Sequence, residues 1–448
     1  MATSLWLRQV QLLTGPEEPL LNTDVLIGAD GALLAWGEAA AARAADLDMP
    51  PTHAGGWLLA PALVDPHSVL EQPLSLQHEN LQSLAQAAAA GGYGTVALLP
   101  WARPWRDRPE RLGGLHWPDP LQLHLWGSFS LDGEDRELAP HLEQREAGAI
   151  GLAGSENLPP LPLLERGLLL GEMAKQPVLI APRQADLCGG GFVREGVETL
   201  RAGWPPDPAV SESLPLAAVL ELARCRPDRR LVLMNLSTAG GVSLLRDEAE
   251  RQRRENATGS ASLAGATVCW WHLLADSGSL DPAQEGGRLV PSLGSPSDRE
   301  ALVVGLEEGL ITAVAVHHLS LDPEEQLLPL DQRRGGLAGH GPVHGLVLPL
   351  LWQELVRRRG WSADQLWQVL CWGPAGLLSR PAPRLQPGSR QWLLFDPETP
   401  WRFKAVTSLS LAANLPVREG CSIRGMVRAS GLSAPDRWRL PAPGCPSD

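Results

Sequence analysis

Residues 79–100 read ENLQSLAQAAAAGGYGTVALLP, and this segment gives the clearest indication of the fold class. Residues 79–90 are rich in alanine, leucine and glutamine, which favour a helix. The glycine pair that follows ends the helix in the manner of a C-cap. Residues 95–99 form a short apolar strand, and a proline closes it. The segment therefore predicts a helix followed by a buried strand, as in α/β proteins.

Similar apolar strands recur along the chain, with helical stretches such as LPLAAVLELARCR between them. They lie near residues 121–129, 147–154, 176–182, 229–237, 266–274 and 311–319. Seven or eight such strands alternating with helices over about 320 residues predict a parallel (β/α)8 barrel of the TIM type. A doubly wound open sheet is the alternative, but no G-x-G-x-x-G follows the first strand.

Both ends of the chain differ from this pattern, because short β-type stretches alternate there with turns. A hairpin is expected around Asp30 and Gly31, and β-type stretches return in SRQWLLFDPETPWRF and GCSIRGMVRASG. We expect the two ends to pair into one small domain. The expected domains are this β-domain, residues 1–60 plus 385–440, a barrel, residues 61–384, and an irregular tail, residues 441–448.

The composition of the chain indicates which kinds of partner and which cellular compartment to expect. The chain has 448 residues and a formal net charge of −13, so nucleic acid and anionic membranes are not expected as main partners. No signal peptide is recognisable and no apolar run reaches about 18 residues, so a cytoplasmic location without a transmembrane helix is expected. The cysteines form no C-x-x-C pair and are expected to be reduced and mostly buried. They are Cys188, Cys225, Cys269, Cys371, Cys421 and Cys445.

Five segments, in the right order, resemble motifs of the dihydroorotase and cyclic amidohydrolase family. They are LVDPHSVLEQP, AAAAGGYGTVALLPW, NLSTAGGV, PSLGSPSDREALVVGLEEGLITAVAVHH and NLPVREGCSIRGMV. The first resembles the family's opening D-P-H-x-H-x-R-E-P, and the third resembles its H-x-S-T-A-x-S-V. The resemblance implies an amidohydrolase-type (β/α)8 barrel with a small β-sandwich domain from both chain ends. That agrees with the pattern described above.

The resemblance also implies a chemistry, the hydrolysis of a cyclic amide at one or two zinc ions. The family's ligands are a His-x-His pair, a carboxylated lysine, two further histidines and an aspartate that moves the proton. In this sequence those six positions carry His67, Val69, Ala153, Ala181, Asn235 and His317. Of these only His67 is a ligand of the family type. The only lysines, Lys175 and Lys404, lie outside the lysine motif.

The positions that bind substrate in the family are replaced as well. Glu71 stands where an arginine would hold the substrate carboxylate, and two carboxylates repel each other. Trp101 replaces one asparagine that contacts substrate. Val290 and Gly294 replace a further asparagine and arginine. The sequence therefore offers no confident catalytic or substrate-binding residue.

Two interpretations of His67 and His317 stay open. They are remnants, hydrogen-bonded in a filled pocket, or they hold one metal ion weakly with help from His318 or Asp65. The first is favoured, because catalytic zinc usually has three protein ligands. His272, after Trp270 and Trp271, is interpreted as a packing residue rather than as part of a new apolar pocket.

Three other features are weaker candidates. Ser237 and Thr238 could suggest a nucleophile, but no Ser-His-Asp spacing accompanies them. The glycine-rich residues 187–196 lack the lysine of a phosphate loop, so we expect an irregular loop over the active-site face. The arginine run at residues 246–256 alternates with acids and is interpreted as a solvated helix face.

The sequence therefore predicts a pseudo-dihydroorotase that keeps the fold and has lost the metal site. No cofactor is expected. The resemblance implies a structural or regulatory role, with aspartate carbamoyltransferase or a second copy of the chain as partner. The alternative is an active cyclic amidohydrolase with a single zinc ion on His67, His317 and His318.

Overall fold

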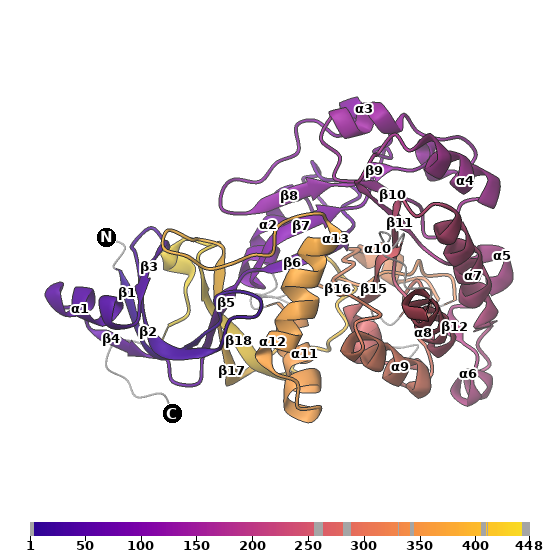
Figure 1. Cartoon of the computed structure of the whole chain (residues 1–448). Coiled ribbons are helices and arrows are strands. Elements are labelled where there is room, and N and C mark those ends of the chain that lie inside the picture. The colour runs from indigo at the N-terminus through magenta and orange to yellow at the C-terminus, as the bar shows by residue number, and fades with distance from the viewer. Residues whose placement is uncertain are drawn as a thin grey trace.

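The computed structural model describes residues 4–254, 263–280, 288–329, 331–340, 345–404, 409 and 411–440. The predicted fold class is confirmed: a (β/α)8 barrel carries a small β-domain from both chain ends (Figure 1). Among the described cysteines, all free, Cys188, Cys269 and Cys371 are buried, and Cys225 and Cys421 are exposed. The expected tail, residues 441–448 with Cys445, lies outside the described residues.

Within the described residues, eight parallel strand positions form the barrel. In chain order they are β6 (Leu63–Ser68), β7 (Tyr93–Leu98), β8 with β9 (Gln122–Leu125 and Gly127–Ser128), β10 (Leu152–Ala153), β11 (Pro177–Ile180), β14 (Arg230–Leu233), β15 (Leu263–Cys269) and β16 (Ala313–Ala315). The strands are short, largely apolar and almost entirely buried, as expected for a parallel sheet covered on both faces.

The barrel closes where its last strand meets its first. The His317 amide donates to the His67 carbonyl oxygen at 3.1 Å, and the Val69 amide donates to the His318 carbonyl oxygen at 2.6 Å. These bonds lie at the carboxyl ends of β6 and β16, so barrel closure places His67 and His317 side by side.

Helices lie around the strand ring (Figure 1). The longer ones are α2 (Leu81–Ala90), α4 (Leu161–Leu170), α7 (Val210–Cys225), α8 (Ala239–Arg254) and α9 (Pro296–Glu307). Shorter ones are α3 (His141–Glu146), α5 (Ala185–Cys188), α6 (Val197–Ala202), α10 (Pro323–Gln326), α11 (Val347–Leu351), α12 (Ala363–Trp367) and α13 (Gly373–Leu377). The predicted arginine-rich face ends α8, where Arg254 pairs with Glu250 at 3.0 Å. Residues 255–256 of that run lie outside the described residues.

Helix α2 begins two residues later than the sequence predicts. Asn80 caps it, because the Asn80 side chain accepts hydrogen bonds from the Gln82 and Ser83 amides, each at 3.0 Å. Glu79 consequently lies outside the helix. Its side chain is buried and reaches the barrel mouth.

The β-domain joins the two ends of the chain. Its described strands are β1 (Leu5–Leu12), β2 (Leu21–Ile27), β3 (Leu33–Trp36), β4 (Pro51–His53), β5 (Leu58–Pro61), β17 (Trp392–Arg402) and β18 (Ser422–Ser430). They form one sheet in the order β18-β17-β5-β1-β2-β3, with β4 beside β1. The hairpin expected around Asp30 and Gly31 is confirmed, since β2 and β3 pair antiparallel across it. β5 pairs with β17, so the two chain ends share one sheet.

The glycine-rich residues 187–196 include one short strand. It is β12 (Val193–Arg194), which pairs with β13 (Pro206–Asp207). Arg194 is 2% exposed and lies 3.0 Å from Asp207 Oδ1 and 3.5 Å from Glu212 Oε2. Most of the segment is turn, bend or coil, as predicted, and the buried ion pair of Arg194 with Asp207 and Glu212 fixes its end.

We expect Arg194→Met to lower the free energy of unfolding by about 3–5 kcal/mol, because Asp207 and Glu212 would remain buried without their cation. Denaturant unfolding of the purified protein measures the change. The matched control is Arg136→Met, whose side chain is 82% exposed and for which a change below about 0.5 kcal/mol is expected. Equal effects of the two substitutions would contradict the anchoring role.

Candidate functional site

His67 and His317 contact each other at the carboxyl ends of the first and last barrel strands. Their Nδ1 atoms lie 3.1 Å apart, the distance of an N–H···N hydrogen bond. His67 Nε2 lies 2.8 Å from Thr267 Oγ1. Both ring nitrogens of His67 are therefore engaged, and a metal ion could bind His67 only by breaking one of these bonds.

Burial keeps this histidine pair neutral. It lowers the pKa of His67 well below the usual value, and the neighbouring His317 lowers it further. Burial, with His272 and His318 nearby, lowers the pKa of His317 to about 3. Neutral imidazole has one donor and one acceptor nitrogen, so the Nδ1 atom of one ring donates to the Nδ1 atom of the other.

The backbone is strained at two positions that correspond to ligands in the resembled family. Asn235 has φ 55° and His317 has φ 47°, both in the left-handed region. Such conformations cost of order 1–3 kcal/mol for most residues and cluster at active sites. Seven other described non-glycine residues also have positive φ, so these angles record unusual main-chain geometry at the two strand ends without marking a functional site by themselves.

The other ligand positions carry side chains that do not suit zinc. Val69, Ala153 and Ala181 are buried and have no donor atom. Asn235 is also buried, and its Oδ1 has no hydrogen-bond partner in the described part of the chain. Within the described residues, no three histidine, cysteine, aspartate or glutamate side chains gather so that they could hold a metal ion. The residues present therefore do not fit the family's zinc site.

A second polar cluster surrounds the closure of the barrel. The His318 imidazole pairs with the Glu79 carboxylate through Nε2. Asp65 Oδ2 lies 3.2 Å from His340 Nε2, and Asp65 Oδ1 accepts a hydrogen bond from the Val316 amide at 3.0 Å. Asp65 and His318, considered from the sequence as auxiliary metal ligands, thus have other partners.

Sequence reasoning missed Glu79 and His340. Glu79 lies just before a helix cap, which was a usable signal that its side chain is not on the helix surface. His340 lies in the glycine-rich LAGHG, where no local pattern indicates a partner. Both contacts depend on the closed barrel, because Glu79 is 239 residues from His318 and Asp65 is 275 residues from His340.

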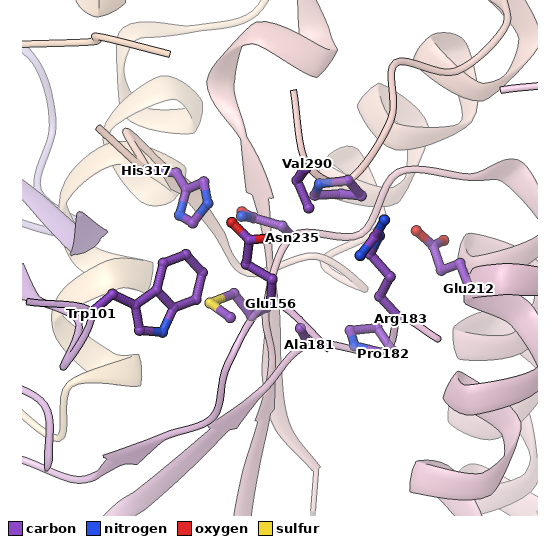
Figure 2. Close-up of a pocket in the computed structure, with 11 residues that line it drawn as sticks. Trp101, Glu156, Ala181, Pro182, Arg183, Glu212, Asn235, Val290 and His317 are labelled. Carbon is purple, nitrogen blue, oxygen red and sulfur yellow. The ribbon is translucent and has the colours of Figure 1, made fainter. Parts of the chain in front are cut away.

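The cavity at the barrel mouth, whose lining side chains are shown in Figure 2, has little space left. Trp101 closes one side of it, donating from Nε1 to the Gly154 carbonyl oxygen at 2.9 Å and meeting His317 edge-on with ring centroids 5.7 Å apart. The space left holds about one water molecule. Its lining residues are Trp101, Glu156, Ala181, Pro182, Arg183, Glu212, Met234, Asn235, Val290, Pro291 and His317.

Glu71 and Gly294 stand at positions that bind substrate in the family. In this chain both contact other residues of the protein. Glu71 pairs with Arg334, at 3.0 Å between Oε2 and Nη2, and with Arg103 at 3.3 Å. The Gly294 carbonyl oxygen accepts a hydrogen bond from the Ser277 amide at 2.6 Å. The reversed charge at Glu71 is thus neutralised within the chain.

The remaining candidates also lie in structural contacts. His272 is buried, and its Nε2 lies 3.1 Å from the Pro291 carbonyl oxygen. The hydroxyls of Ser237 and Thr238 each donate to the Glu212 carboxylate at 2.5 Å. These contacts hold the strand end in place and do not pair a hydroxyl with a histidine base.

Comparison with known proteins identifies relatives that align with most of the chain. The chain is 32% identical over 395 residues to a probable dihydroorotase-like protein of Synechocystis sp., covering 80% of this chain and 85% of the relative. It is 30% identical to a dihydroorotase of Thermus aquaticus, covering 88% of this chain and 89% of the relative. No family model matches the chain.

Solved structures agree on the fold. The L-hydantoinase of Arthrobacter aurescens aligns with a TM-score of 0.73 at 17% identity, covering 96% of this chain and 94% of the other. An inactive dihydroorotase-like domain of a Chaetomium thermophilum CAD-like multifunctional protein aligns with a TM-score of 0.55 at 14% identity, covering 83% and 92%. In the described part of the chain, no helix is long and apolar enough to cross a membrane.

The buried histidines make stability depend on pH. The unfolded chain protonates His317 and His272 near pH 6.5, whereas the folded chain, with pKa values of about 3 and about 4, keeps them neutral. The unfolded state binds more protons, so the free energy of unfolding falls as pH decreases. We expect a loss of about 2 kcal/mol for each histidine between pH 7 and pH 5, measured by denaturant unfolding.

His317→Asn provides the matched variant, because asparagine tolerates a left-handed backbone and does not titrate. Its loss of stability between pH 7 and pH 5 should be smaller than that of the unaltered protein by about 2 kcal/mol. Identical pH dependence in the two proteins would show that His317 is not held neutral by burial.

Proposed function

The chain belongs to the dihydroorotase family, and we propose that it acts in pyrimidine biosynthesis but has no metal-dependent hydrolase activity. The observation that carries this proposal is the hydrogen-bonded pair of His67 and His317 in a nearly filled cavity. Three further ligand positions, Val69, Ala153 and Ala181, have no donor atom.

The chemistry of cyclic amide hydrolysis supports this proposal. The reaction needs a nucleophile, which family members obtain by lowering the pKa of water at zinc. It also needs a base whose pKa lies near the working pH. The residue at the base position here is His317, whose pKa of about 3 makes it a weak proton acceptor at neutral pH. The described side chains at the barrel mouth include no set of metal ligands that could activate water. Glu156 lines the cavity and burial raises the pKa of its carboxyl group, but no activated nucleophile accompanies it.

For the role of such a protein, we propose a structural or regulatory subunit with aspartate carbamoyltransferase as its partner. Support comes from the inactive dihydroorotase-like domain noted above, which is part of a CAD-like multifunctional protein. A folded barrel that catalyses no reaction still has surfaces through which it can bind another protein. The second candidate partner for this structural role is another copy of the same chain, in a homo-oligomer.

Metal analysis with a hydrolysis assay tests the first part of the proposal. We expect protein purified after growth with zinc to hold far less than one zinc ion per chain and to show no turnover of dihydroorotate. Stoichiometric zinc with turnover that His67→Ala abolishes would support the single-metal hydrolase instead. The control for that outcome is His116→Ala, which changes an exposed histidine and should leave any turnover intact.

Co-purification tests the proposed partner separately. A tagged form of the full chain, co-expressed with the aspartate carbamoyltransferase of the same organism, should retain that enzyme through affinity and size-exclusion steps. The tag alone is the control. Complete separation of the two proteins would contradict the proposed partnership with aspartate carbamoyltransferase. It would not affect the proposal that the chain has no hydrolase activity. A symmetric species of this chain alone would favour the homo-oligomer.

A further inference from the structure

A second cavity, of about 530 Å³, lies away from the barrel mouth and faces the amino-terminal halves of β6, β7 and β8. Arg380, Arg384 and Arg390 line it together with His124, and no aspartate or glutamate is among the described residues of its lining. Active sites of barrels of this type lie at the opposite, carboxyl-terminal end of the strands. The cavity is therefore separate from the site at His67 and His317.

Two nitrogen atoms of residues that line this cavity have no hydrogen-bond partner among the described residues. Arg390 Nε and His124 Nε2 are both buried and make no hydrogen bond in the part of the chain that the structure describes. Most buried polar groups in folded proteins do have a partner. Both nitrogen atoms are shielded from solvent, so a ligand in the cavity would meet the exposed guanidinium groups before it met either of them.

The contact between Arg380 and His124 fixes which histidine nitrogen is the donor. Arg380 Nη2 lies 3.3 Å from His124 Nδ1. A guanidinium can only donate, so Nδ1 accepts and the ring proton lies on Nε2. Burial and the charge of Arg380 lower the pKa of His124 to about 4, so the ring is neutral at pH 7. Nε2–H is thus a donor without an acceptor among the described residues, shielded from solvent behind the cavity wall.

The charge of the cavity is opposite to that of the whole chain. The formal net charge is −13, yet three arginines gather here, and only Arg384 has an acidic partner, Glu18 at 3.2 Å, among the described contacts. Guanidinium groups suit phosphate and carboxylate, which accept two parallel hydrogen bonds. The volume is within the range of small-molecule sites, and apolar residues such as Leu378 complete the lining.

We propose that this cavity binds a small anion with two or more negative charges, carried by phosphate or carboxylate groups. Arg380 and Arg390 supply the charge and the hydrogen-bond donors. The site is independent of the proposed function, because none of its residues lines the barrel mouth.

Calorimetric titration of the full-length protein tests the site, with pyrophosphate and citrate as probes at an ionic strength fixed by sodium chloride. We expect one probe to bind with a stoichiometry of one per chain. Stronger binding of pyrophosphate would assign a phosphate ligand, and stronger binding of citrate would assign a polycarboxylate. Absence of heat for both probes at millimolar concentration would overturn the proposal.

The variants separate this cavity from general charge attraction. The double variant Arg380→Gln with Arg390→Gln should weaken binding roughly 100-fold, about ten-fold for each charged contact. Arg136→Gln removes an exposed arginine elsewhere and should leave binding unchanged. Unaltered binding in the double variant, or equal weakening in the control, would overturn the proposal. Arg380→Gln alone changes only an exposed side chain, and its expected ten-fold effect keeps the test valid if the double variant unfolds.

Discussion

The structure depends on the closure of the barrel between β6 and β16. A closed barrel leaves no strand edge free, so its first and last strands must bond to each other. Here the closing bonds come from the backbone of His67, Val69, His317 and His318. Three of these four residues are histidines with buried side chains, and each of these polar side chains needs a hydrogen-bond partner. The contacts at the barrel mouth follow from that requirement.

The same requirement explains how the chain accommodates so many replaced positions. Where the family would use metal ions to neutralise and connect polar side chains, this chain connects them directly. His67 bonds to His317, His318 to Glu79, and His340 to Asp65. Glu71, which looks unfavourable in the sequence, is neutralised by Arg334 from a distant loop. The result is a barrel mouth whose polar groups are largely satisfied without a ligand.

The fold could be predicted from the sequence because its signals are local. Short apolar strands, helical stretches and turn residues each occupy a few consecutive positions, and their order indicates a barrel. The ligand positions could be found because motifs fix them. The partners could not, because Asp65 meets His340 only after the whole barrel has closed. The start of α2 and the strand β12 in residues 187–196 were missed for related reasons, a cap and a buried ion pair that outweigh propensity.

The left-handed backbone at Asn235 and His317 has a consequence for protein engineering. Catalytic groups work only when the main chain holds them within fractions of an ångström, and unusual main-chain angles are hard to install by design. This barrel already has such angles at two strand ends that correspond to ligand positions of the family. Building a metal centre here would therefore be mainly a matter of exchanging side chains and clearing Trp101 from the cavity, on a scaffold whose main chain needs little redesign.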